Sequence, residues 1–168
     1  MGEWDRMVDV VVATGATAHE GDDVAGAVSQ AHAQHARVKV DGAVDVGAEL
    51  DEIALEWSLG GKLVVITRGG DGVTLYLNGL KLHAKAPKID LVDTVGAGDT
   101  FMANLLAELD LVGALGDDPI SRLAKLDAAA LQNAAEVAAV AAGIVCERKG
   151  CEPPTLAETT ARVASQAR

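Results

Sequence analysis

Apolar and polar positions follow clear helical and strand patterns in the middle of the chain. In the segment 49–59 the apolar residues Leu50, Ile53 and Trp57 recur every three or four positions, which predicts a helix that ends at Gly60-Gly61. The segment 62–67, with the sequence KLVVIT, is a continuous apolar run. Such a run is typical of a strand that is covered on both faces of its sheet.

A hairpin and a long helix are predicted next. The apolar runs 72–77 and 80–84 flank Asn78-Gly79, a dipeptide that strongly favours a two-residue β-turn between paired strands. The segment 90–94 then leads into a glycine-rich turn. The helix expected after this turn has one apolar face, formed by Phe101, Met102, Leu105, Leu106, Leu109 and Val112.

The C-terminal part of the chain is rich in alanine. After a loop at 113–119, the segment 120–145 predicts one or two helices whose small side chains allow close packing. Pro153-Pro154 ends this pattern, and a short terminal helix is expected from about Leu156.

The first third of the chain carries weaker patterns. The β-branched run 8–13 predicts a buried strand, 24–37 a helix and 38–40 a further short strand. Strands that alternate with helices are typical of a layered α/β fold. We therefore expect the 168 residues to form a single α/β domain with a largely parallel sheet.

Composition and charge exclude several classes of function. The chain is 49% hydrophobic and 23% charged, as in globular proteins, and its 2% of aromatic residues argues against stacking surfaces for single-stranded nucleic acid. With 14 basic and 25 acidic residues the net charge is −11, so a nucleic-acid backbone would be repelled. An anionic ligand would need a local device, such as backbone amides at the start of a helix.

The sequence also carries signals of cellular location. The two cysteines, Cys146 and Cys151, do not make a disulfide framework, which favours a reduced, cytoplasmic compartment. We expect no membrane-spanning segment, because no uncharged apolar stretch of about 18 residues occurs. The first residues do not have the pattern of a signal peptide.

The segment with the most specific chemistry is 93–100, with the sequence DTVGAGDT. Its small residues allow the backbone to approach a ligand closely, and the start of a helix offers free N–H groups to an anion. A carboxylate at Asp99 beside such a cradle suits phosphoryl transfer, because it can take the proton from an attacking hydroxyl. The alternative is a tight turn in which Asp99 is the N-cap of the helix. The glycine pattern alone does not decide between the two.

Three segments in order resemble one family. DTVGAGDTFMANLL at 93–106 resembles the second signature of the ribokinase-like carbohydrate kinases, also called the phosphofructokinase-B family. TRGGDG at 67–72 is similar to the T-x-G-x-x-G turn of that family, and 139–155 to its alanine-rich helix and closing loop, with a likeness to bacterial fructokinases. The resemblance covers roughly residues 38–158, while 1–37 are poorly matched. It implies a three-layer α/β/α ribokinase-like fold.

The resemblance also implies roles for individual residues. Asp99 matches the catalytic base, and Gly96, Ala97 and Gly98 match the anion hole. The residues that match contacts with ATP are Thr67, Gly69, Gly72 and, in the helix beside the adenine, Asn133. Asp93 and Val95, with carbonyl groups of the loop 147–151, match a monovalent-cation site that takes K⁺ in many members. The cofactors implied are ATP and Mg²⁺.

The chain also departs from the family pattern. We recognise neither the glycine-rich G-G-N motif that contacts the sugar nor the N-x-x-E segment that organises magnesium. The chain therefore resembles the C-terminal, nucleotide-side portion of such a kinase, a partial domain. The first hypothesis is an ATP-dependent sugar kinase, with fructose as the favoured acceptor. The alternative is a catalytically silent nucleotide-binding module or a truncated kinase. A second copy of the chain or a complementing N-terminal half would be its protein partner.

Overall fold

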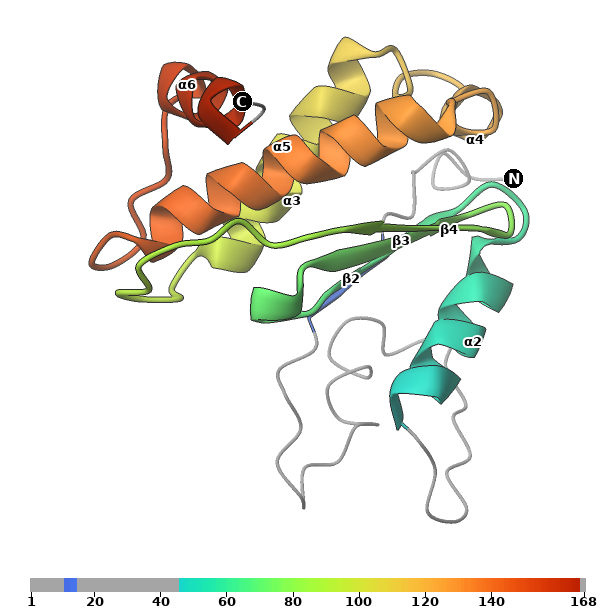
Figure 1. Cartoon of the computed structure of the whole chain (residues 1–168). Coiled ribbons are helices and arrows are strands. Elements are labelled where there is room, and N and C mark those ends of the chain that lie inside the picture. The colour runs from blue at the N-terminus through green and yellow to red at the C-terminus, as the bar shows by residue number, and fades with distance from the viewer. Residues whose placement is uncertain (1–10, 15–45, 167–168) are drawn as a thin grey trace.

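A computed structural model describes residues 11–14 and 46–166, which form a four-stranded sheet with helices on both faces (Figure 1). In chain order the elements are β1 (Val11–Thr14), α2 (Val46–Ser58), β2 (Leu63–Thr67), the short 3-10 helix η2 (Gly69–Asp71), β3 (Val73–Leu77), β4 (Leu80–Ala84), α3 (Ala97–Leu111), α4 (Pro119–Leu123), α5 (Ala128–Cys146) and α6 (Leu156–Gln166). These bounds confirm the elements predicted after residue 48. The predicted helix 24–37 and strand 38–40 lie outside the described residues.

The strands of the sheet follow one another in the order β1-β2-β3-β4. β1 pairs with β2 in parallel, whereas the β2–β3 and β3–β4 pairings are antiparallel. The β3–β4 hairpin turns at Asn78 and Gly79, which have positive φ angles of 49° and 83°. These angles are those of a turn whose twist matches that of the strands, so the local sequence determines this antiparallel part of the sheet.

Side chains of β2 alternate between the two faces of the sheet and build two cores. Leu63 and Val65 belong to the larger core, which β3, β4, α3 and α5 share. Val64 and Ile66 belong to a smaller core on the opposite face, where α2 covers the sheet. The three layers of the predicted α/β/α fold are therefore present (Figure 1).

Helices α3 and α5 form the layer over the larger core. Phe101, Leu105 and Leu109 are the apolar residues of α3 that are buried, at a spacing of four residues. Val112, predicted on the same face, is the C-cap residue that follows the end of α3, and it is 49% exposed. The facing side of α5 is mostly alanine, which lets the two helices pack closely.

Helix α5 is also the described helix that could cross a membrane by length and composition. Of its most apolar stretch, 61% is buried inside the protein, against α3, β4 and α6. This burial accounts for the apolar composition of α5 and favours its interpretation as a core helix.

Candidate functional site

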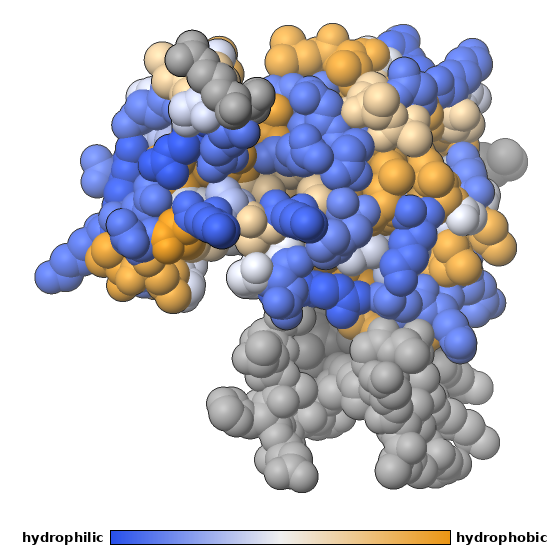
Figure 2. Space-filling view, in the orientation of Figure 1, coloured by the Kyte–Doolittle hydropathy of each residue, from blue (hydrophilic) through white to orange (hydrophobic). Residues whose placement is uncertain are grey.

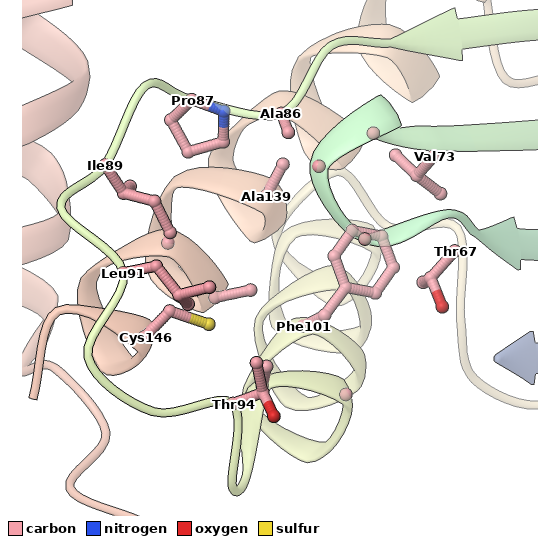
Figure 3. A pocket seen from close by; sticks show the side chains of 17 residues that line it. Thr67, Val73, Ala86, Pro87, Ile89, Leu91, Thr94, Phe101, Ala139 and Cys146 are labelled. Carbon is pink, nitrogen blue, oxygen red and sulfur yellow. The ribbon is translucent and has the colours of Figure 1, made fainter. Parts of the chain in front are cut away.

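A cavity of about 350 Å³ opens where the end of β2, the turn η2, the β4–α3 connection, the first turn of α3 and the second half of α5 meet (Figure 3). Its walls are mostly apolar or made of glycine, with Thr67 and Thr94 as the two hydroxyl-bearing residues. The residues that line it are Thr67, Gly69, Gly70, Gly72, Val73, Ala86, Pro87, Ile89, Leu91, Thr94, Ala97, Gly98, Phe101, Ala139, Ala142, Gly143 and Cys146. This lining contains no charged or carboxamide side chain among the described residues. Such a cavity suits a flat, weakly polar group.

The predicted anion hole forms the first turn of α3 at the edge of this cavity. Gly96 is the N-cap residue in the left-handed conformation, with φ 81°, and its carbonyl accepts a hydrogen bond from the amide of Thr100 at 2.9 Å. The amides of Gly98 and Asp99 have no carbonyl four residues earlier within the helix and remain available to a ligand. Ala97 and Gly98 line the cavity, whereas Gly96 supports the turn from outside.

Asp99 lies in the first turn of α3 and is exposed. The N-cap position belongs to Gly96, and no side chain caps this end of the helix. The alternative interpretation of Asp99 as the N-cap is therefore wrong. Its carboxylate remains free for another role. Asp99 is not one of the residues that line the cavity, but it directly follows the lining residue Gly98. A negative charge at this position is compatible with the positive end of the helix dipole.

Asp93 ties the same turn to the loop that follows α5. One carboxylate oxygen accepts the amide of Val95 at 3.1 Å, and the other accepts the amide of Gly150 at 2.9 Å. These backbone hydrogen bonds hold the pKa of Asp93 below its ordinary value, against a smaller opposing effect of desolvation. Of the two residues predicted for a cation site, Asp93 is thus engaged with amides, while Val95 is 57% exposed.

The glycines of the 67–72 segment have different surroundings. Gly69, with φ 55°, has no atom within 4 Å of the position that a Cβ would occupy, so this position is open. Gly72 packs against the backbone of Ala84 and Ala86. The amide of Arg68 donates to the carbonyl of Gly72 at 2.7 Å and closes the turn. Thr67, Gly69 and Gly72, the residues predicted to contact ATP, all line the cavity.

Asn133 is not brought to the cavity. It is exposed on α5, whose first lining residue is Ala139, about 9 Å further along the helix. The residues that the sequence analysis missed are the apolar walls, above all Pro87, Ile89 and Gly143. A Cβ at Gly143 would lie 2.6 Å from the Pro87 Cγ atom, and a glycine within an alanine-rich helix was the available signal of this close approach.

The apolar wall continues onto the surface. Leu91, Val92 and Val95, in the connection between β4 and α3, are 65%, 60% and 57% exposed. Hydrophobic side chains gather over this connection at the lower left of Figure 2. The rim of the cavity therefore carries apolar surface of the kind that a further segment or partner covers.

The model of one known family matches the region that builds this site. It is described as pfkB family carbohydrate kinase and matches residues 45–158. The chain belongs to the pfkB family of carbohydrate kinases. This confirms the resemblance that the three motifs carried, including its extent along the chain.

Curated relatives match parts of this pfkB-family chain. A fructokinase of Rhizobium leguminosarum bv. trifolii is 42% identical over 84 residues, which are 49% of the chain and 25% of that relative. The bifunctional protein HldE of Caulobacter vibrioides is 34% identical over 122 residues, which are 72% of the chain and 21% of that protein. The chain thus spans about a quarter of the length of these relatives.

A solved structure shows the same fold. Fructokinase from Vibrio cholerae O395, in a form described as bound to fructose, ADP and calcium ion, superposes with a TM-score of 0.53. The match has 24% sequence identity and covers 69% of this chain and 34% of that structure. The ribokinase-like fold, as a partial domain, is therefore confirmed.

Proposed function

We propose that this chain forms the nucleotide side of an ATP-dependent sugar kinase, which transfers the γ-phosphoryl group to a sugar hydroxyl. The observation that carries the proposal is the apolar cavity flanked by open glycines at the end of β2 and by free amides at the start of α3. An adenine base would occupy the apolar part. The phosphates would extend along Gly69 toward Gly98, where backbone amides would stabilise their negative charge.

Asp99 is the proposed catalytic base. The oxygen of the sugar hydroxyl forms a bond to the γ-phosphorus, the bond from that phosphorus to the bridging oxygen of ADP breaks, and Asp99 takes the hydroxyl proton. Its exposed position in the first turn of α3, directly after the lining residue Gly98, supports this role. The amides stabilise the negative charge on the transferred group while the carboxylate faces the acceptor.

The cations of the proposal are Mg²⁺ and K⁺. Among the described residues no group of three or more His, Cys, Asp or Glu side chains could hold a metal ion. Mg²⁺ would therefore be bound mainly through the nucleotide phosphates, as is usual for this ion. Asp93 fits a K⁺ site less directly, since both of its carboxylate oxygens already accept amide hydrogen bonds. A cation there would share these oxygens with the amides.

Fructose is the proposed acceptor. The closing segment CERKGCEPPT resembles that of fructokinases, and a curated fructokinase is 42% identical over its matched part. Ribose, adenosine and keto-deoxy sugar acids are the competing acceptors. The described lining contributes no charged or amide side chain to a sugar. This favours a second candidate function, namely nucleotide binding without turnover by this chain alone.

Calorimetry of the chain with Mg-ATP, followed by titration with fructose, ribose and adenosine, tests the proposal. Binding of ATP and of one sugar, with sugar-dependent release of ADP, is the expected result for the kinase. Binding of ATP without any sugar selects the second candidate. If ATP does not bind, the assignment of the cavity is wrong.

The exposed apolar rim supports a proposed protein partner. Leu91, Val92 and Val95 would be covered by a second copy of the chain or by a complementing N-terminal half. Sedimentation velocity measured over a range of protein concentrations distinguishes a self-associating chain from a monomer. A kinase of this kind would work in the cytoplasm, where ATP is available.

A further inference from the structure

We propose that α6 positions the anion-binding turn at the start of α3, and that Arg148 is the positioning residue through which it acts. The inference rests on the proposed function, because that function places phosphates at this turn. It concerns the segment 147–155, which lies between α5 and α6 and contacts the turn directly.

The segment touches the turn at two places. The amide of Gly150 donates to one carboxylate oxygen of Asp93 at 2.9 Å, while the other oxygen accepts the amide of Val95 within the turn. The side chain of Cys151 lies on Gly96, where a Cβ atom would stand 2.2 Å from its sulfur. Movement of Gly150 and Cys151 would therefore displace both Asp93 and the N-cap of α3.

The same segment is held to α6 by two ion pairs. Arg148 donates to the carboxylate of Glu158 in the first turn of α6. Glu147 accepts from both terminal nitrogens of Arg162, at 2.6 Å and 3.3 Å. The two ion pairs therefore link α6 to Glu147 and Arg148, the first two residues of the segment 147–155.

Arg148 is the centre of this arrangement because it also binds the segment itself. Its Nη1 atom donates to the carbonyl of Glu152 at 3.2 Å and to that of Pro153 at 3.5 Å. Glu158, its partner, in turn accepts the amide and the hydroxyl of Thr155 at the start of α6. A single exposed ion pair contributes little, but removal of Arg148 releases a carboxylate and two carbonyls together.

The competing explanation is that these contacts only fasten α6 to the protein. That role would affect global stability and would alter the binding of every ligand in the cavity to the same degree. A positioning role instead affects ligands that need the turn. ATP carries phosphates and adenosine does not, so a comparison of the two separates the explanations.

The variants are chosen to keep the fold. Arg148→Ala removes all contacts of the guanidinium, whereas Arg148→Lys keeps the charge for Glu158. Glu158→Gln removes the charge of the partner and retains oxygen for the cap of α6. Arg122→Ala is the matched control, since Arg122 on α4 also donates to a backbone carbonyl, that of Gly113 at 3.2 Å.

The first measurement is amide hydrogen exchange, which needs no ligand. We expect Arg148→Ala and Glu158→Gln to accelerate exchange in residues 93–100 about tenfold, with the β2–β3 segment 63–77 unchanged. Arg148→Lys should restore most of the protection, and Arg122→Ala should match the wild type. Equal acceleration in both segments, or none in 93–100, would overturn the proposal.

The second measurement is affinity by calorimetry. Arg148→Ala should weaken ATP binding by about tenfold, comparable to one hydrogen bond to a charged group, and leave adenosine within about twofold. Equal losses for the two ligands would refute the positioning role. If the wild-type chain binds neither ligand, the proposed function fails, and the exchange data still decide whether α6 positions the turn.

Discussion

Gly72 lies directly against Ala84: a Cβ atom at position 72 would stand 2.2 Å from the carbonyl oxygen of Ala84 and 2.8 Å from the amide nitrogen of Ala86. Its φ angle of 95° is also one that other residues rarely adopt. The absence of a side chain at Gly72 therefore allows the backbone after η2 to pack against the end of β4. Packing against β4, as well as its place in the cavity lining, explains why the last position of the T-x-G-x-x-G pattern is a glycine.

Replacement of Gly72 should thus act on folding. We expect Gly72→Ala to lower the free energy of unfolding by at least about 2 kcal/mol, because the left-handed backbone and the contact with Ala84 both oppose a side chain. Urea denaturation followed by circular dichroism measures this. The control is Gly70→Ala, which has open space around it and no positive φ, and should stay within about 0.5 kcal/mol of the wild type. Equal stability of both variants would contradict the packing argument.

Asp99→Asn tests the proposed base. Sugar-dependent phosphoryl transfer should fall by about 10²–10⁴-fold, whereas the affinity for ATP changes little because backbone amides hold the phosphates. A coupled assay of ADP release and calorimetry give the two quantities. Asp110→Asn, an exposed carboxylate near the other end of α3, is the matched control and should turn over normally. Near-normal turnover of Asp99→Asn would remove Asp99 from the mechanism.

Gly98→Val tests the close approach of a ligand to the start of α3. Gly98 lines the cavity, so a branched side chain there would occupy the space proposed for the phosphoryl oxygens. ATP affinity should drop by more than about tenfold with little change in the unfolding midpoint. Ala103→Val, at an exposed position of the same helix, serves as the control. If ATP use were lost only together with the helical circular dichroism signal, the turn would have a purely structural role.

Local signals in the sequence predicted most of the described fold. The Asn78-Gly79 pair determines the hairpin, and the four-residue repeat of Phe101, Leu105 and Leu109 determines the buried face of α3. These signals act between neighbours in the chain. The contiguous motifs 67–72 and 93–100 both contribute residues to the cavity, although Gly96 and Asp99 are not among those that line it.

Contacts between distant segments could not be predicted in this way. The approach of Pro87 to Gly143 depends on how the β4–α3 connection crosses α5. The glycine within an alanine-rich helix signals a close approach, but it does not identify Pro87 as the partner. Asn133 was assigned by position within a helix, yet the cavity begins about 9 Å further along α5. The contact of Gly150 with Asp93 likewise joins residues that are far apart in the chain.

Asp51 of α2 also makes contacts with residues far away in the chain, one of which is Arg68 in the 67–72 turn. Its carboxylate accepts the hydroxyl of the buried Tyr76 at 2.5 Å and the Nζ atom of Lys81 at 2.7 Å, and it pairs with Arg68. Partial burial raises the pKa of Asp51, but the hydrogen bonds from Lys81 and Tyr76 and the charge of Arg68 outweigh it, so the pKa lies below its ordinary value. Burial and the bond to Asp51 raise the pKa of Tyr76.

The lowered pKa of Asp51 predicts how stability depends on pH. A carboxylate with a folded-state pKa below its unfolded value of 3.8 stabilises the protein above that value and loses this contribution as the pH falls through the folded pKa. Asp51→Asn should therefore cost about 1–3 kcal/mol at pH 7, and its deficit against the wild type should shrink below about pH 4. Urea denaturation between pH 2.5 and pH 7, taken in steps of about half a unit, measures the difference. Asp117→Asn, on an exposed loop, is the control that should follow the wild type. A deficit that stayed constant down to pH 2.5 would show that the charge of Asp51 does not stabilise the fold.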